Sequence, residues 1–222
     1  ELDSPRGRIY LIKQMLESGV GTSARIVRHI DRCLSCLSCM TTCPSGVHYM
    51  HLVDHAREII EETYKRPYAE RTLRILLAWL LPRPNLFRLA LLGAWLTKPF
   101  AALAPGRLKA LLSMAPSHVP PPSSVDRPQV HAAEGLRRGR VALLIGCAQR
   151  VLNPAINEAT IRLLNRCGIE VVVARGAGCC GALTHHMGLT SNSRAMAATN
   201  AQAWMAEIEG EGLDAIIINA SG

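Results

Sequence analysis

Aromatic residues and long hydrophobic runs are both scarce in this sequence. Phe, Trp and Tyr make up 4% of the 222 residues, so few rings are available to stack on nucleotide bases. The apolar runs at residues 75–81 and 89–96 are much shorter than the roughly 20 residues that cross a bilayer. We therefore expect no nucleic-acid partner and no transmembrane helix.

Targeting signals are missing as well. The opening residues ELDSPRGRIY lack the apolar core and the cleavage site of a signal peptide. They also lack an initiating Met, and the last apolar run, residues 215–219, stops just before the end of the sequence. We therefore expect a fragment that is truncated at both ends.

Acidic residues are absent from residues 71–125, which hold most of the net charge of +8. The basic residues of this stretch are Arg71, Arg74, Arg83, Arg88, Lys98, Arg107 and Lys109. A basic, apolar and helical stretch of this kind can form ordinary helices with solvated cations, dock on a partner subunit, or lie on an anionic membrane surface. The sequence leaves these three interpretations open.

The order of apolar patterns predicts an α+β protein of two domains joined by a helical segment. Residues 1–66 read as short helices, one of them capped by Ser23 and another, over 47–65, with Val53, Ala56, Ile60 and Tyr64 on one face. Residues 67–128 contain the basic helices and a linker rich in Pro and Ser. Residues 129–222 alternate strands with helices, which predicts a parallel sheet.

The cysteines are clustered, which is typical of metal ligands and not of the disulfide framework of a short secreted chain. We therefore expect a reducing compartment, the cytoplasm, with a peripheral position on the inner face of the plasma membrane left open. The first cluster reads C-x2-C-x2-C-x3-C-P and consists of Cys33, Cys36, Cys39, Cys43 and Pro44. This spacing places three thiolates around one 4Fe-4S cluster and directs the fourth to another cluster. Zinc and fortuitous core cysteines are the alternatives. Backbone N–H groups expected to donate to the sulfurs are those of Leu34, Ser35, Leu37 and Ser38.

The second cluster combines Cys147, which follows one predicted strand, with Cys179 and Cys180, which follow the next. The carboxyl ends of parallel strands meet at one sheet edge, where a third strand end near residues 220–222 is also expected. A metal or iron-sulfur site, redox-active thiols and buried cysteines all remain open here. His185 and His186 follow closely enough to act as a ligand or proton donor, although surface positions are also open.

Cys167, at a predicted helix end, is expected to be a small buried hydrophobe.

These motifs together resemble the iron-sulfur subunits of bacterial glycolate oxidase. The residues that carry the resemblance are ELDSPRGRIYLIK, CLSCLSCMTTCPSGV, GCAQ at 146–149 and GCCGA at 178–182. The resemblance implies an α-helical ferredoxin domain over 1–66, of which only the second cluster half is present, and a C-terminally truncated cysteine-rich CCG domain over 129–222. A first ferredoxin motif would precede residue 1, and a further cysteine would follow Gly222.

The resemblance also implies a function, cofactors and partners. Two 4Fe-4S clusters would lie in the ferredoxin domain and a further cluster or metal in the CCG domain, with FAD on a partner subunit. The chain would relay electrons from glycolate oxidation to glyoxylate towards a membrane quinone pool, and it would have no substrate site of its own.

Related subunits of lactate utilisation, of glycerol-3-phosphate dehydrogenase and of heterodisulfide reductase, where the thiols or cluster are catalytic, are the alternatives. A zinc-stabilised interaction module is another.

Overall fold

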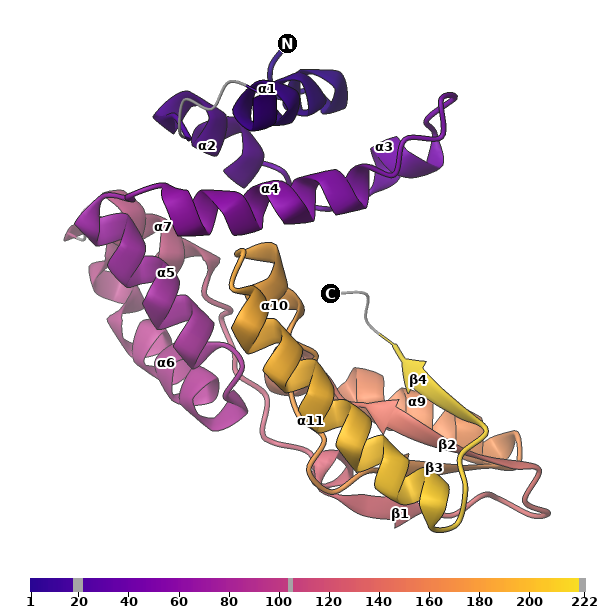
Figure 1. Ribbon diagram of the computed structural model, residues 1–222. Coiled ribbons are helices and arrows are strands. Elements are labelled where there is room, and N and C mark those ends of the chain that lie inside the picture. The colour runs from indigo at the N-terminus through magenta and orange to yellow at the C-terminus, as the bar shows by residue number, and fades with distance from the viewer. Residues whose placement is uncertain (18–21, 104–105, 220–222) are drawn as a thin grey trace. The chain divides into compact units, whose positions relative to one another are not determined.

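The computed structural model describes residues 1–17, 22–103 and 106–219 (Figure 1). The chain forms two compact units, and each is described by itself. The first unit combines Glu1–Ile75 with Gly181–Arg194, and the second combines Leu76–Cys180 with Ala195–Gly222. The three-part division expected from the sequence remains a prediction.

The first unit is helical. Its helices are α1 (Pro5–Glu17), α2 (Ala24–Asp31), α3 (Ser38–Thr41), α4 (Tyr49–Thr63), the first part of α5 (Tyr68–Leu80), α10 (Ala182–His186) and the beginning of α11 (Thr190–Glu209). The core lies where α1, α2 and α4 meet, and Leu11, Ile30, Val53 and Ile60 are almost completely buried there. Ser23 caps α2, because its side chain accepts a hydrogen bond from the Ile26 N–H. The expected cap and the expected buried face of α4 are both confirmed.

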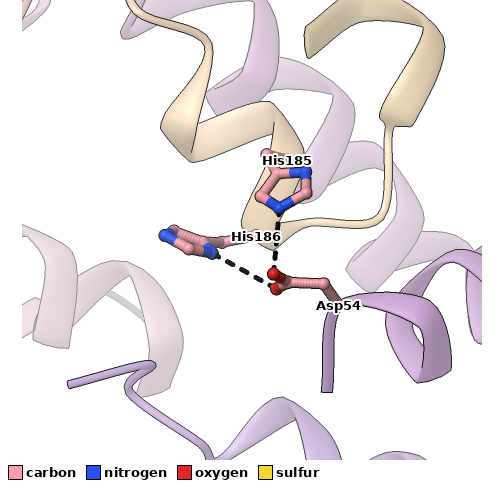
Figure 2. Close-up of side chains that lie close together, drawn as sticks. All are labelled: Asp54, His185 and His186. Carbon is pink, nitrogen blue, oxygen red and sulfur yellow. Dashed lines mark ion pairs between the residues drawn. The ribbon is translucent and has the colours of Figure 1, made fainter. Parts of the chain in front are cut away.

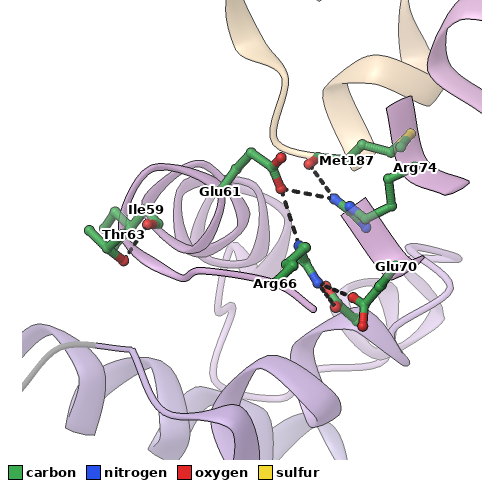
Figure 3. A network of polar contacts seen from close by, with 8 residues as sticks. Ile59, Glu61, Thr63, Arg66, Glu70, Arg74 and Met187 are labelled. Carbon is green, nitrogen blue, oxygen red and sulfur yellow. Dashed lines mark hydrogen bonds and ion pairs between the residues drawn. The ribbon is translucent and has the colours of Figure 1, made fainter. Parts of the chain in front are cut away.

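A buried arginine fixes the end of α4 and the start of α5. The Arg66 side chain is 4% exposed and forms ion pairs with Asp31 and Glu70, each at 2.6 Å, and with Glu61 at 3.3 Å (Figure 3). A buried charge is tolerated only when it is paired in this way. Glu61 also pairs with Arg74, whose guanidinium donates to the carbonyl of Met187 at 2.7 Å. The Arg74 bond ties the segment Gly181–Arg194 to the helices of this unit.

The second unit is built on a four-stranded sheet in the order β1-β3-β2-β4. Its strands are β1 (Gln129–His131), β2 (Gly139–Leu144), β3 (Ile169–Val173) and β4 (Ala215–Ile218). The remaining elements are α6 (Pro84–Thr97), η1 (Lys98–Leu103), α7 (Gly106–Met114), η2 (Ser124–Asp126), α8 (Gln149–Leu152) and α9 (Ala155–Arg166), with the rest of α11.

The sheet is mixed, which corrects the expectation of a parallel sheet. Strands β3 and β4 both pair with β2 in parallel, as expected, but β1 pairs antiparallel with β3 at the edge. Strand β1 has only three residues, two of them exposed, so its sequence lacks the apolar run from which a strand is recognised.

The two faces of the sheet are covered by different helices. Val171 and Val173 of β3 pack in one cluster with Ile161 of α9, whereas Val172 packs in another with Ala203 of α11. Figure 1 shows α11 in front of the strands and α9 behind them. This alternation follows from the two-residue period of a strand and makes β3 buried on both faces.

Exposed apolar side chains are frequent on α6, η1 and α7. Examples are Leu89 and Leu96 on α6, and Phe100 on η1. Within the described ranges, no helix combines the length and the apolar character needed to cross a membrane.

Candidate functional site

The first cysteine cluster lies in the loop between α2 and α4 and in the short helix α3. Ser35 and Leu37 adopt left-handed backbone angles, with φ of 53° and 55°. Such angles are costly for residues other than glycine and are concentrated at functional sites. Alternating backbone handedness also turns successive N–H groups toward one concavity, an arrangement found around phosphates and iron-sulfur clusters. The loop is therefore shaped to surround an anionic group.

The four cysteines line two neighbouring hollows, and Cys39 lines both. Cys33, Cys36 and Cys39 line one hollow of about 350 Å³, together with Tyr49. Cys39 and Cys43 line the other, of about 370 Å³, again with Tyr49. The assignment of Cys33, Cys36 and Cys39 to one cluster and of Cys43 to another remains a prediction from their spacing. The four side chains are reduced thiols, so they are suited to ligation.

Hydrogen-bond donors surround two of the sulfurs. The backbone N–H and the hydroxyl of Ser38 donate to Cys36 and lower the pKa of its thiol. Backbone N–H groups of Val47 and Ser45 lower the pKa of Cys43 in the same way. Both effects favour the thiolate, which is the form that binds metal. Ser38 was among the expected donors, whereas the turn after Cys43 was missed.

Tyr49 and Arg57 of α4 contact the cysteine loop, and the sequence analysis missed both. The Tyr49 hydroxyl lies 3.5 Å from the Cys33 sulfur, and burial, with a smaller effect from Cys33, raises the pKa of Tyr49. Arg57 is 6% exposed and donates to the Cys33 carbonyl at 2.6 Å and to the Ser35 hydroxyl at 2.5 Å. An arginine on the otherwise apolar face of α4, next to Ala56, is the sequence signal that could have found Arg57.

The second cysteine cluster lies at the carboxyl ends of β2 and β3. The sulfurs of Cys147 and Cys179 are 3.3 Å apart, and Cys180 follows as an exposed residue. The hydrogen bond from Cys179 lowers the pKa of Cys147 to about 7, although burial opposes this effect. Two of the three expected thiols therefore meet at the sheet edge. The third strand end expected there, residues 220–222, lies outside the described residues.

Asn200 of α11 positions the loop that carries the cysteine pair. Its side chain is 2% exposed, accepts from the Gly178 N–H at 2.7 Å and donates to the Cys179 carbonyl at 2.9 Å. Neither spacing nor periodicity singled out this residue, because an asparagine on a long helix has no local signature.

A polar network lies next to Cys147. Gln149 donates to Asn157 at 2.6 Å and to Asn219 at 2.9 Å. Asn157 is completely buried and donates to Asp126 at 2.7 Å and to the Ile145 carbonyl at 3.0 Å. The GCAQ motif therefore continues into a network that holds the end of β2 against α9.

His185 and His186 lie with Asp54 of α4 (Figure 2). Asp54 is 3.0 Å from His185 and 3.8 Å from His186. Burial, and to a smaller extent the charge of Arg57, lowers the pKa of His186. The partner of the two histidines within this unit is therefore a carboxylate that the sequence analysis did not consider.

Cys167 is exposed, and the expectation of a buried cysteine was wrong. It ends α9, where its N–H bonds back to carbonyls of the last turn, and Gly168 then reverses the chain with a φ of 78°. A residue at such a helix end faces solvent even when its side chain is small and apolar.

The chain is similar to a family of cysteine-rich domains over part of its length and to curated iron-sulfur subunits over all of it. Residues 141–222, which contain the second cysteine cluster, match the family model of the CCG cysteine-rich domain. The whole chain is 43% identical to the glycolate oxidase iron-sulfur subunit of Escherichia coli (strain K12) over 222 residues. It is 32% identical to the probable glycolate oxidase iron-sulfur subunit of Bacillus subtilis (strain 168) over 234 residues.

These matches confirm the resemblance that the cysteine motifs indicated. The alignments cover all of this chain but 51% and 52% of the two relatives, so the chain spans about half the length of the curated relatives it matches. No solved structure matches the chain.

Proposed function

We propose that this chain carries iron-sulfur clusters and acts as the electron-transfer subunit of a glycolate-oxidising complex. The observation that carries the proposal is that Cys33, Cys36 and Cys39 line one and the same hollow. The similarity along the whole chain to iron-sulfur subunits of glycolate oxidase supports the same function.

The residues present fit a 4Fe-4S cluster at three of its four corners. Cys33, Cys36 and Cys39 would supply these corners, and Cys43 would serve a second cluster. Such clusters supply one-electron transfer when bound. Ser38 donates to Cys36, and Tyr49 places a hydroxyl near Cys33, so both side chains stabilise negative charge on sulfur. Stabilising the thiolate charge in this way tunes the reduction potential, which is the contribution a protein makes to such a site.

The partners and the location belong to the same proposal. FAD-containing subunits would oxidise glycolate to glyoxylate, and electrons would leave through this chain towards a quinone acceptor, in the cytoplasm or on the inner membrane surface. The FAD subunit would decide which 2-hydroxy acid is oxidised, because the oxidation would take place there.

Three of the basic side chains of residues 71–125 are engaged inside the protein, so they are not available to dock on a partner. Arg88 donates to the carbonyls of Pro120 and Arg150, and Lys98 donates to the Ala115 carbonyl at 2.9 Å. Arg83 donates to the Trp79 carbonyl and lies 5.0 Å from the centre of its ring. These cations hold the segment together, so we assign docking to its exposed apolar side chains and to the exposed Lys109.

Anaerobic purification of a Cys36→Ser variant tests the cluster assignment. Cys167→Ser is the matched control, because Cys167 is an exposed cysteine outside both clusters. We expect the electron paramagnetic resonance signal of the reduced protein to be lost or strongly altered by Cys36→Ser and retained by Cys167→Ser. Identical spectra for the two variants would remove Cys36 from the cluster.

Dithiol chemistry at Cys147 and Cys179 is the second candidate function. Their 3.3 Å separation and the lowered pKa of Cys147 are what a reactive thiol pair needs. If the isolated protein reduces disulfides and loses this activity in Cys179→Ser, the catalytic interpretation replaces electron transfer at this site. If it shows no such activity, the pair is assigned to metal or cluster binding.

A further inference from the structure

A carboxylate and two imidazoles converge where α10 packs against α4. The ligand atoms of Asp54, His185 and His186 all lie within 4.8 Å of one another (Figure 2). The two histidines are consecutive on a short helix, and their ring centres are 5.6 Å apart with the planes tilted by 51°. Figure 2 shows both rings turned toward the Asp54 carboxylate from different sides.

This cluster contains buried polar atoms that lack hydrogen bonds. Among the described residues, Asp54 Oδ1 and His186 Nδ1 are both shielded from solvent and have no hydrogen-bond partner. They face each other at 3.8 Å, which is too long for a hydrogen bond. An unsatisfied buried donor or acceptor costs free energy, so an atom that bridged the two would stabilise the pair.

The spacing suits a metal ion as the bridge. Zinc binds imidazole nitrogen and carboxylate oxygen at about 2.0–2.2 Å, so two ligands of a tetrahedral ion are about 3.4 Å apart. The observed separations, 3.0 Å from Asp54 Oδ2 to His185 Nε2 and 3.8 Å from the other oxygen, Oδ1, to His186 Nδ1, lie on either side of this value. Small rotations of the three side chains would complete the geometry.

Several contacts anchor the backbone around the cluster, so only side-chain rotations are needed to adjust the three ligands. Arg74 donates to the Met187 carbonyl at 2.7 Å, directly after the two histidines. Gly188 has a φ of 78°, and a Cβ atom there would lie 2.4 Å from the Arg57 carbonyl oxygen of α4. Thr184 is 1% exposed and closes the first turn of α10 by donating to the Gly181 carbonyl at 2.8 Å. Preorganised ligands of this kind are what a metal site requires.

We propose that Asp54, His185 and His186 form a binding site for a divalent transition-metal ion, separate from the cysteine clusters. Two nitrogens and one carboxylate oxygen form a ligand set that zinc and ferrous iron accept, with further positions open to water. Asp54 neutralises part of the ion's charge, whereas the positive charge of Arg57 opposes binding. The Arg57 guanidinium is engaged with the Cys33 carbonyl and the Ser35 hydroxyl. The bound ion would clamp α10 onto α4.

Zinc retention by the untagged, anaerobically purified chain tests this site. The chain is equilibrated with Zn²⁺ and passed through gel filtration. We expect the wild-type chain to retain one zinc ion per chain more than the Asp54→Asn or His186→Gln variant retains. His118→Gln is the control, because His118 is exposed and outside the cluster, and it should match the wild type. Equal zinc in wild type and both variants, or no retained zinc in the wild type, would overturn the proposal.

Hydrogen exchange decides the question if either variant fails to fold. In the wild-type chain, Zn²⁺ should slow exchange of the amides of α10 by at least about tenfold, since metal ligation stabilises the folded arrangement. Exchange of β3 amides serves as the internal control and should not change. Exchange in α10 that is unaffected by Zn²⁺ would contradict the site even without the variants.

Discussion

At the scale of single residues, Arg57 shows how the cysteine loop depends on side chains outside its motif. Its guanidinium binds the loop at Cys33 and at Ser35, where the backbone adopts an angle that costs free energy. Tyr49 of α4 also reaches the first cysteine, with its hydroxyl 3.5 Å from the Cys33 sulfur. Arg57 is therefore a positioning residue for the proposed cluster.

We expect Arg57→Gln to lower the free energy of unfolding by about 2 to 3 kcal/mol, because hydrogen bonds to charged groups contribute about 1.5–3 kcal/mol. Chemical denaturation of the anaerobic protein measures this change. Arg28→Gln, an exposed arginine of α2, should stay within about 0.5 kcal/mol of the wild type. Equal losses in both variants would contradict the role of Arg57.

Asp126 carries a pH dependence of stability. It is 2% exposed, and burial raises the pKa of its carboxyl although the hydrogen bond from Asn157 opposes this. As pH rises above 3.8, the unfolded chain therefore loses this proton before the folded chain does, and stability falls until the raised pKa is passed. The Asp126→Asn substitution removes this loss of stability. At pH 7 the variant should therefore unfold at a higher denaturant concentration than the wild type, and the difference should shrink toward pH 4. A variant that is less stable than the wild type at pH 7 would show that the charge itself is needed.

At the scale of elements, the segment Gly181–Arg194 is held on α4 by a close backbone approach. Gly188→Ala would combine a left-handed residue, which costs about 1–3 kcal/mol, with a clash against the Arg57 carbonyl. Gly212→Ala is the matched control, since Gly212 has a similar φ of 83° with no atom close to an added Cβ. We expect the thermal midpoint to fall clearly further in Gly188→Ala than in Gly212→Ala. Equal decreases would mean that the approach to α4 contributes nothing.

Sequence patterns predicted the elements whose cause is local. The cap at Ser23, the buried face of α4 and strands β2 to β4 follow from short-range spacing. The sequence analysis did not predict the antiparallel strand β1, because three residues are too few to show a periodic pattern.

The sequence analysis did not identify Asp54, Arg57 and Asn200, for a different reason. Each acts on residues at least 21 positions away in the chain, and the resulting contacts exist only after folding. No local pattern records such partners.

At the scale of the whole molecule, the exposed apolar side chains of the helical segment are an unusual surface for an isolated protein. Leu89, Leu96 and Phe100 are about two-thirds exposed. Exposed apolar side chains that form a contiguous patch mark an interaction surface, so we expect these helices to contact a partner. This surface is the part of the chain where the proposed flavin subunit or membrane would attach.

Replacing Leu89 and Leu96 by Ser should weaken co-purification with partner subunits while leaving the fold intact, because both side chains are exposed. Leu136→Ser, at an 86% exposed position, is the control and should leave co-purification unchanged. Sedimentation with vesicles containing anionic lipid distinguishes the membrane from the subunit as the partner. If the double variant binds both as well as the wild type, this surface is not the attachment site.

The central claim is that the cysteines hold iron-sulfur clusters, and the metal and sulfide content of the anaerobically purified protein tests it most directly. The account predicts iron and acid-labile sulfide in equal amounts, with both lowered in Cys36→Ser and not in Cys167→Ser. Zinc in place of iron at the cysteines, with no sulfide, would contradict it.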